Sequence, residues 1–409
     1  MAEGRIIQHV AGIIAEYNPL HPGHVVLMEA ARRQAGTAVI CCMSGDFVQR
    51  GDLAVVRRQA RAQAAVLSGA DLVLELPLPW AVSSAEGFAE GGVTHLLATG
   101  LVDTLVFGSE CGDAKLLQDV AALLLRGDFS ASLREELSKG ISFPAARQRA
   151  AERLGGNAVG TVLSHPNDLL AVEYCKSLLK RDKSIRVMAV PRQGAAHGAL
   201  SYGEGDLPSA SSLRALLRTG AREQALRGMA DAMRDRYLAE EAAGRAPVFY
   251  ETVERAILAK LRSMTEEEFA ALDEGREGLY HRLYRSVHGA ASVAQVLERA
   301  KTKRYPLARL RRMVLWACLG IQGRPSAPLY LRPLAMNDTG RRLLAQMRTT
   351  LPVLSRAGHA RTLAPEALGL LRLEERAAEL YALAYPALAA ADGGALWKEG
   401  CAFFGKERI

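Results

Sequence analysis

Two histidines near the start of the chain have the spacing and the setting of a phosphate site. His21 and His24 flank a Pro-Gly pair, between a predicted strand over residues 11–15 and a predicted helix over 24–34. The N-terminus of such a helix attracts anions through its free backbone N–H groups and its dipole. Glycine lets the backbone come close to a phosphate, and imidazole N–H groups stabilise charge on its oxygens. We therefore expect an ATP-using enzyme in which His21 and His24 are catalytic; structural hydrogen bonds of two loop histidines are the alternative.

A second polar group stands at the start of a later helix. Ser211 and Arg214 belong to a serine-rich stretch over 208–214, a pattern typical of a helix N-terminus. Backbone amides, hydroxyls and a guanidinium at such a start can all reach phosphate oxygens. Alone, this stretch is an ordinary serine cap. Combined with the histidine pair it predicts the other side of a triphosphate cradle, with Arg214 catalytic and Ser211 binding ATP.

Three further segments allow both a functional and a structural interpretation. The loop over 44–51 suits a substrate pocket or an ordinary surface loop. Asn167 could recognise the ligand, or it could cap a helix together with Asp168. Arg192 follows a predicted strand and could reach a phosphate or a carboxylate, or it could be a plain surface arginine.

The elements that must position these residues alternate between strand and helix. Short apolar runs separated by helical patterns predict strands over residues 11–15, 37–43, 71–75, 104–107 and 185–190. This alternation predicts an α/β fold, a parallel sheet with helices on both faces. Ligands of such folds bind at the carboxyl ends of the strands, where the opening loop and the segments 44–52, 77–84 and 108–110 would meet.

The chain is long enough for two domains. At 409 residues it can bury two cores, and its strand signals fade after about residue 220. We expect residues 1–222 to form the ATP-binding catalytic domain. Residues 223–409 would then form a mainly α-helical second domain.

The net charge of +8 is concentrated in the second half. The first half is balanced to +1, whereas residues 299–348 contain 12 basic residues and a single acid, Asp338. Such a surface predicts a polyanionic partner, with nucleic acid ahead of membrane. A solvated helix face is the alternative. The expected RNA contacts, with the tyrosine stacking on an unpaired base, are Lys301, Lys303, Arg304, Tyr305, Arg309 and Arg312.

The cysteines indicate a reducing compartment. All six are scattered without a C-x-x-C pair, which argues against a zinc site or a disulfide framework. No signal peptide or membrane-spanning run is apparent. We expect a cytoplasmic protein that has no metal site of its own.

Five segments, in order, resemble one enzyme family. Residues 16–24, 43–51, 71–77, 107–110 and 301–305 resemble the bacterial tRNA(Met) cytidine acetate ligases, members of the nucleotidyltransferase superfamily. The resemblance implies a Rossmann-like nucleotidyltransferase domain. It also implies that acetate and ATP, with Mg²⁺, form acetyl-adenylate, and that the acetyl group passes to N4 of the wobble cytidine of elongator tRNA(Met). Acetyl-CoA would not be used.

The resemblance also assigns ATP-binding residues. Departures at Leu20, Pro22 and Asp52-Leu53, where the family usually has Phe, Asn and Glu-Pro, remove no histidine or glycine of the core motif. Carried over position by position, ATP binding falls on Ile14, Ala15, Glu16, Tyr17, Asn18, Pro19, Leu20, His21, Pro22, Gly23, His24, Gly108, Asn167 and Arg192.

Two other classes of protein compete with this assignment. A small-molecule adenylyltransferase would share the His-x-Gly-His motif but would not need the basic segment over 299–348. An RNA-binding protein with a vestigial nucleotide site is a second alternative. The intact His21, Gly23, His24 and Arg214 argue against it.

Overall fold

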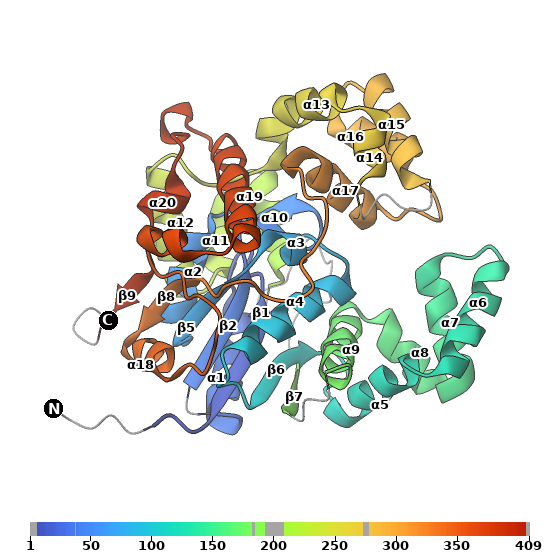
Figure 1. Cartoon of the computed structure of the whole chain (residues 1–409), viewed down its shortest axis with the longest axis horizontal. Helices are drawn as coiled ribbons and strands as arrows, with labels where there is room; N and C mark the ends of the chain where they lie inside the picture. The colour runs from blue at the N-terminus through green and yellow to red at the C-terminus, as the bar shows by residue number, and fades with distance from the viewer. Residues whose placement is uncertain (1–5, 37, 182–184, 193–207, 273–277, 406–409) are drawn as a thin grey trace.

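The computed structural model describes residues 6–36, 38–181, 185–192, 208–272 and 278–405. At its centre is a seven-stranded sheet in the order β7-β6-β1-β2-β5-β8-β9 (Figure 1). Five of its strands are parallel, as the alternation predicts. They are β1 (Val10–Ala15), β2 (Ala38–Ser44), β5 (Leu72–Leu76), β6 (Thr104–Ser109) and β7 (Arg186–Pro191).

Both faces of the sheet are covered by helices, so its central strands are buried and mostly apolar. Every residue of β2 and β5 is buried, which is typical of parallel strands covered on both faces. Neighbouring residues enter opposite cores: Ile13 and Cys41 belong to one buried cluster, whereas Ile14 and Cys42 belong to the cluster on the other face.

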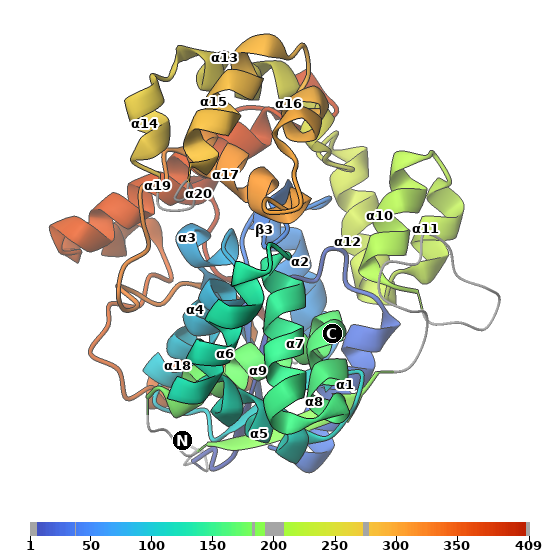
Figure 2. The same ribbon diagram turned by 90° about the vertical axis from the view of Figure 1, so that its right-hand side faces the viewer.

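The helices around the sheet alternate with its strands in the first part of the chain. The helices of the first part of the chain are α1 (Pro22–Gln34), α2 (Arg58–Leu67), α3 (Leu78–Ala81), α4 (Ala85–Ala98), α5 (Ala114–Leu124), α6 (Gly127–Ser138), α7 (Phe143–Gly155), α8 (Asn157–Ser164) and α9 (Pro166–Leu179). A two-stranded hairpin, β3 (Phe47–Val48) and β4 (Asp52–Leu53), follows β2. Helices α5–α8 project as an arm beside α9 (Figures 1 and 2).

Some of the later helices form a lobe, and others pack against the sheet and its neighbouring helices. Helices α13–α17 pack together into the lobe (Figure 2). The bounds are α10 (Ala210–Arg218), α11 (Arg222–Gly228), α12 (Asp231–Ala242), α13 (Glu254–Ser263), α14 (Glu266–Ala270), α15 (Leu279–Gly289), α16 (Val293–Ala300), α17 (Leu307–Leu319), α18 (Asp338–Gln346), α19 (Pro365–Ala382) and α20 (Ala395–Lys398), with 3-10 turns at Tyr250–Val253, Ala357–Thr362 and Leu388–Ala390.

Two strands of the second half complete the sheet, which corrects the expectation that strands end before residue 222. β8 (Pro333–Asn337) pairs antiparallel with β5, and β9 (Ala402–Phe404) pairs with β8. Leu, Ala and Met in β8 have little intrinsic strand preference. The strand is set by tertiary contacts: the Asn337 backbone N–H donates to the Asp71 carbonyl at 3.0 Å, and its side-chain amide donates to the Asp71 carboxylate at 2.9 Å. The division of the chain near residue 222 remains a proposal.

Candidate active site

A cavity of about 610 Å³ lies at the carboxyl ends of β1 and β6. The chain order of the strands reverses between these two neighbours, because β2 and β5 extend to one side of β1 whereas β6 and β7 extend to the other. Such a reversal opens a crevice, the usual ligand site of open α/β sheets. The cavity brings together these predicted residues: Ile14, Ala15, Glu16, Tyr17, Asn18, His21, His24, Gly108, Asn167, Arg192, Ser211 and Arg214.

The first wall of the cavity is the loop between β1 and α1. His21 caps α1, and its Nδ1 accepts a hydrogen bond from the Gly23 backbone N–H at 3.2 Å. The Nδ1 of His24 accepts from the His21 backbone N–H, also at 3.2 Å. In a neutral imidazole the proton must then sit on Nε2. Each ring therefore has one N–H donor that its local backbone does not use.

The histidines are neutral donors. Burial, and then the cations Arg192 and Arg214, lower the pKa of His21 to about 3. Burial and the neighbouring His21 lower the pKa of His24 well below its usual value. The two rings lie 3.8 Å apart between centroids, so two positive charges there would repel. Both can therefore donate hydrogen bonds to a phosphate at neutral pH without carrying a positive charge.

Some residues of the opening loop act through their packing. A Cβ atom at Gly23 would lie 3.0 Å from the His21 ring, so this glycine leaves room for the cap. Leu20 is buried in the core on the α1 side of the sheet. Pro19, Leu20, Pro22 and Gly23 do not line the cavity. These four residues shape the loop, and their predicted ATP contacts stay predictions.

The second wall is the N-terminus of α10. Ser209, one residue before the helix, accepts a hydrogen bond from the Ser212 N–H at 3.1 Å and lies 2.9 Å from the Ser211 hydroxyl. The Arg214 guanidinium donates to the backbone carbonyl of Asn18 at 2.6 Å. This contact ties the helix to the histidine loop. It holds the predicted arginine at the edge of the cavity.

The third wall joins the end of β6 to the start of α9. Glu110 accepts hydrogen bonds from the Asn167 side chain and, at 2.8 Å, from the Asp168 backbone N–H. In return, the buried Asp168 carboxylate accepts from the Ser109 hydroxyl and from the Glu110 N–H at 2.8 Å. Asp168 therefore holds the loop that follows Gly108. Asn167 lines the cavity, as does Arg192 at the end of β7.

Arg61 is an organising residue that the sequence analysis missed. Its side chain is fully buried in α2 and donates to the carbonyls of Val56 at 2.8 Å and Ser44 at 3.2 Å, and also to those of Glu16 and Gly45. The last residues of β1 and β2 are thereby fastened together. In the sequence, Arg61 stands among alanines, and nothing in that pattern distinguishes a buried arginine from an exposed one. In the structure, almost every residue of α2 is buried.

The fourth wall comes from the second half of the chain. Leu307, Ala308, Arg311 and Arg312 of α17 line the cavity, and the loop of the β3–β4 hairpin packs on this helix. Gly51 packs so closely on α17 that a Cβ atom would lie 2.5 Å from a backbone nitrogen of that helix. Gln49 and Arg50 of this loop also line the cavity. The basic segment therefore adjoins the predicted ATP site.

The exposure of the predicted RNA contacts differs among them. Lys301, Lys303 and Arg304 are exposed, and Arg309 and Arg312 are half-buried. Tyr305 is only 8% exposed and belongs to the core of the lobe, with the Arg304 and Arg309 guanidinium groups each 5.8 Å from its ring centroid. This burial disfavours the stacking expected of the ring, which stays a prediction.

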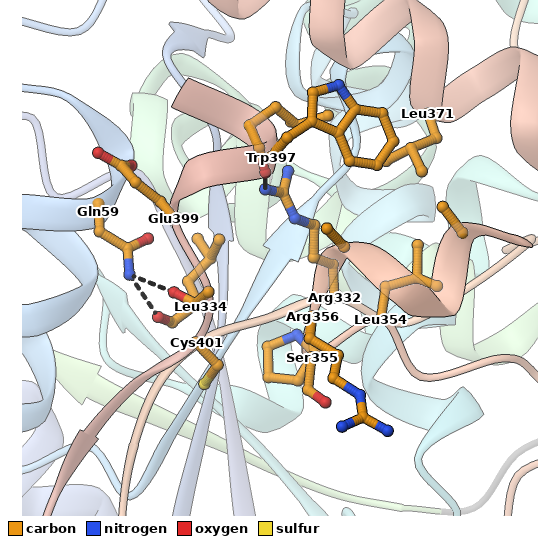
Figure 3. A pocket seen from close by; sticks show the side chains of 15 residues that line it. Gln59, Arg332, Leu334, Leu354, Ser355, Arg356, Leu371, Trp397, Glu399 and Cys401 are labelled. Carbon is orange, nitrogen blue, oxygen red and sulfur yellow. Dashed lines mark hydrogen bonds between the residues drawn. The ribbon is translucent and has the colours of Figure 1, made fainter. Parts of the chain in front are cut away.

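Other hollows and clusters do not match this site. A hollow of about 30 Å³ beside β8 has room for only one or two waters (Figure 3). There the side-chain amide of Gln59 donates hydrogen bonds to the carbonyls of Leu334 and Gly400, both at 3.0 Å. Among the described residues, no cluster of three or more His, Cys, Asp or Glu could hold a metal ion. None of the described helices is long and apolar enough to cross a membrane.

Comparison with known proteins agrees with this geometry. The family profile described as HIGH Nucleotidyl Transferase matches residues 8–394. The tRNA(Met) cytidine acetate ligase of Acetivibrio thermocellus is 33% identical, covering 92% of this chain and 95% of that protein; the one from Halothermothrix orenii gives the same three values. The crystal structure of apo Thermotoga maritima TmcAL superposes with a TM-score of 0.91 at 32% identity, covering 97% of this chain and 100% of that one. The same protein bound with alpha-thio ATP gives 0.90 at 31% identity, with the same coverage.

Proposed function

The chain belongs to the HIGH nucleotidyl transferases and, among them, to the tRNA(Met) cytidine acetate ligase family; on this premise we propose that it acetylates a tRNA cytidine with acetate and ATP. The acceptor is the N4 amine of the wobble cytidine of elongator tRNA(Met). The acyl donor is acetate, and acetyl-CoA is not used. The reaction takes place in the cytoplasm.

The first step forms acetyl-adenylate. An acetate oxygen attacks the α-phosphorus of ATP, and the bond to the pyrophosphate oxygen breaks. The Nε2–H groups of His21 and His24, with Arg192 and Arg214, offset the charge that develops on the departing pyrophosphate. Each preorganised contact of this kind is worth about 2.7–4 kcal/mol of barrier. Mg²⁺ would enter on the triphosphate oxygens and would neutralise part of their charge.

The second step transfers the acetyl group. The N4 amine is a poor nucleophile because its lone pair is delocalised into the ring. Orientation against the mixed anhydride can supply roughly 7–11 kcal/mol. To orient the amine in this way, the enzyme must bind the RNA tightly close to the adenylate. The exposed cations Lys301, Lys303 and Arg304 lie just before α17, whose own residues line the ATP cavity.

The contact between α17 and the ATP cavity is the observation that carries the proposal. A small-molecule adenylyltransferase would have no need for a cationic segment at this wall. An enzyme that must present an RNA base to an adenylate needs that arrangement.

The test follows acetate and cytidine together. Purified protein is incubated with ATP, labelled acetate and tRNA(Met), and AMP release and N4-acetylcytidine are measured. We expect acetylated tRNA only when both acetate and ATP are present. Product formed from acetyl-CoA without ATP, or AMP release that does not depend on acetate, would overturn the proposal.

A further inference from the structure

A second pocket, of about 250 Å³, adjoins the ATP cavity. The two meet at Arg311, which lines both of them. Residues of the hairpin, α10, the turn before α13, α16 and α17 line the second pocket. Those used below are Asp52, Arg218, Tyr250, Leu297, Arg311 and Val314.

Two charged groups of this pocket have unused hydrogen-bonding capacity. Within the described parts of the chain, the half-buried Asp52 carboxylate accepts only one hydrogen bond, from the next backbone N–H at 2.9 Å. Arg311 is exposed to solvent, and it makes neither a hydrogen bond nor an ion pair with any described residue. Arg218, by contrast, pairs with Glu251 at 3.2 Å and lies over an aromatic ring. A ligand that offers both a donor and an acceptor would therefore complement Asp52 and Arg311.

Asp52 lines the second pocket, two residues after Arg50, which lines the ATP cavity. The charges that act on its carboxylate are Arg214 from the ATP side and Arg218 and Arg311 from the second pocket. Arg214 and Arg218 are one turn apart on α10, so a carboxylate near both lies beside the boundary. Burial outweighs these cations and raises the pKa of Asp52 above its usual value, which makes the carboxylate a better proton acceptor.

We propose that the second pocket receives the acceptor cytosine, turned out of the RNA, with its N4 amine on Asp52 and its ring acceptors on Arg311. This inference rests on the proposed function. Enzymes that act on a base commonly take it out of the stack and hold it against an aromatic ring, which Tyr250 supplies here while Arg311 faces the edge of the base. An aspartate is the natural acceptor for cytosine N4–H, whereas uracil would turn an oxygen toward the same carboxylate.

The size of the pocket favours a base over other reactants. Its volume lies just below the roughly 300–1,000 Å³ of pockets for drug-sized ligands, which suits one heterocycle. Acetate would leave most of it empty. The apolar side chains Leu297 and Val314 would contact the ring and exclude water from it.

The chemical step balances with Asp52 as the base. The N4 lone pair forms a bond to the acetyl carbonyl carbon. The bond from that carbon to the phosphate oxygen breaks, and AMP leaves with the electron pair. One N4 proton passes to the Asp52 carboxylate, which returns it to solvent after release of the product.

The test separates the two steps with Asp52→Asn, which keeps the side-chain shape. Acetate-dependent exchange of pyrophosphate into ATP, without tRNA, measures adenylation. Single-turnover transfer from preformed acetyl-adenylate to tRNA measures acceptor chemistry. We expect exchange to stay within about twofold and transfer to fall by about 100-fold or more, the usual contribution of a general base. Asp52→Glu should recover part of the transfer rate.

A matched control and a second variant complete the design. Asp119→Asn changes an exposed aspartate on α5 and should alter neither rate. Leu297→Trp fills the pocket and should abolish transfer while exchange persists, exchange itself reporting a folded protein. Equal loss of both rates in Asp52→Asn, or transfer at the wild-type rate in either variant, would overturn this inference and leave the proposed function intact. A wild-type protein that exchanges no pyrophosphate with acetate would overturn both.

Discussion

Replacement of Arg61 by methionine tests how the site is held in place. Methionine keeps much of the side-chain volume but removes every donor. The carbonyls of Glu16, Ser44, Gly45 and Val56 then lose the guanidinium that they share. Glu16 directly follows β1, and Ser44 is the last residue of β2. Without the guanidinium, the start of the histidine loop is no longer bonded to the end of the neighbouring strand.

The expected loss of stability follows from these four bonds. A hydrogen bond to a charged group contributes about 1.5–3 kcal/mol, which sets a ceiling of roughly 6–12 kcal/mol for four. The four share one side chain, and the buried guanidinium carries its own desolvation cost, so their energies do not add. Removal of the guanidinium leaves neutral carbonyls without their partner, which costs about 1–3 kcal/mol for a buried polar group. We expect a loss in that range, and at least a tenfold weaker affinity for ATP.

The assay combines urea unfolding with ATP binding. Arg33→Met is the control, because Arg33 is exposed in the last turn of α1 and its loss should cost about 1 kcal/mol or less. A loss below 1 kcal/mol in Arg61→Met, together with unchanged ATP affinity, would refute the idea that this residue fastens the two strand ends.

Three further predictions concern the histidines and the basic segment. Because the pKa of His21 is about 3 when folded and near 6.5 when unfolded, its contribution to stability is complete above pH 6.5 and is lost as pH falls from 6.5 to 3. Stability should therefore fall by about 1.4 kcal/mol per pH unit from this residue, and His21→Asn should flatten that slope in urea titrations. His21→Ala with His24→Ala should abolish pyrophosphate exchange while tRNA binding by gel shift persists; unchanged exchange would contradict the assignment. Lys301→Ala with Arg304→Ala should weaken tRNA binding and lower the salt slope by about two, and an unchanged slope would remove this segment from the RNA surface.

The sequence predicted the parts of the molecule whose local signals agree with their tertiary setting. The five parallel strands are mostly apolar runs, and β2 and β5 are fully buried, so the pattern of the central strands indicated strands. The histidine loop was also recognisable, since its residue types, spacing and position after a strand all indicate an anion site. His21 and His24 line the cavity as expected.

The features that the sequence did not predict depend on contacts between distant segments. β8 becomes a strand through pairing with β5 and through Asp71, more than 250 positions earlier. Tyr305 resembles an exposed aromatic among cations, but it packs inside the helical lobe. Both segments are too short to show a hydrophobic periodicity from which strand pairing or burial could be predicted.

The late position of β8 has a consequence for synthesis of the protein. The ribosome must add about 250 residues after β5 before its antiparallel neighbour exists, which takes tens of seconds at roughly 5–20 residues per second. Throughout that time β5 is an open edge of mostly apolar residues, the kind of edge that pairs with other chains. The nascent chain thus carries an aggregation-prone strand until its last fifth emerges. Recombinant fragments that end before Pro333 should inherit the same exposed edge.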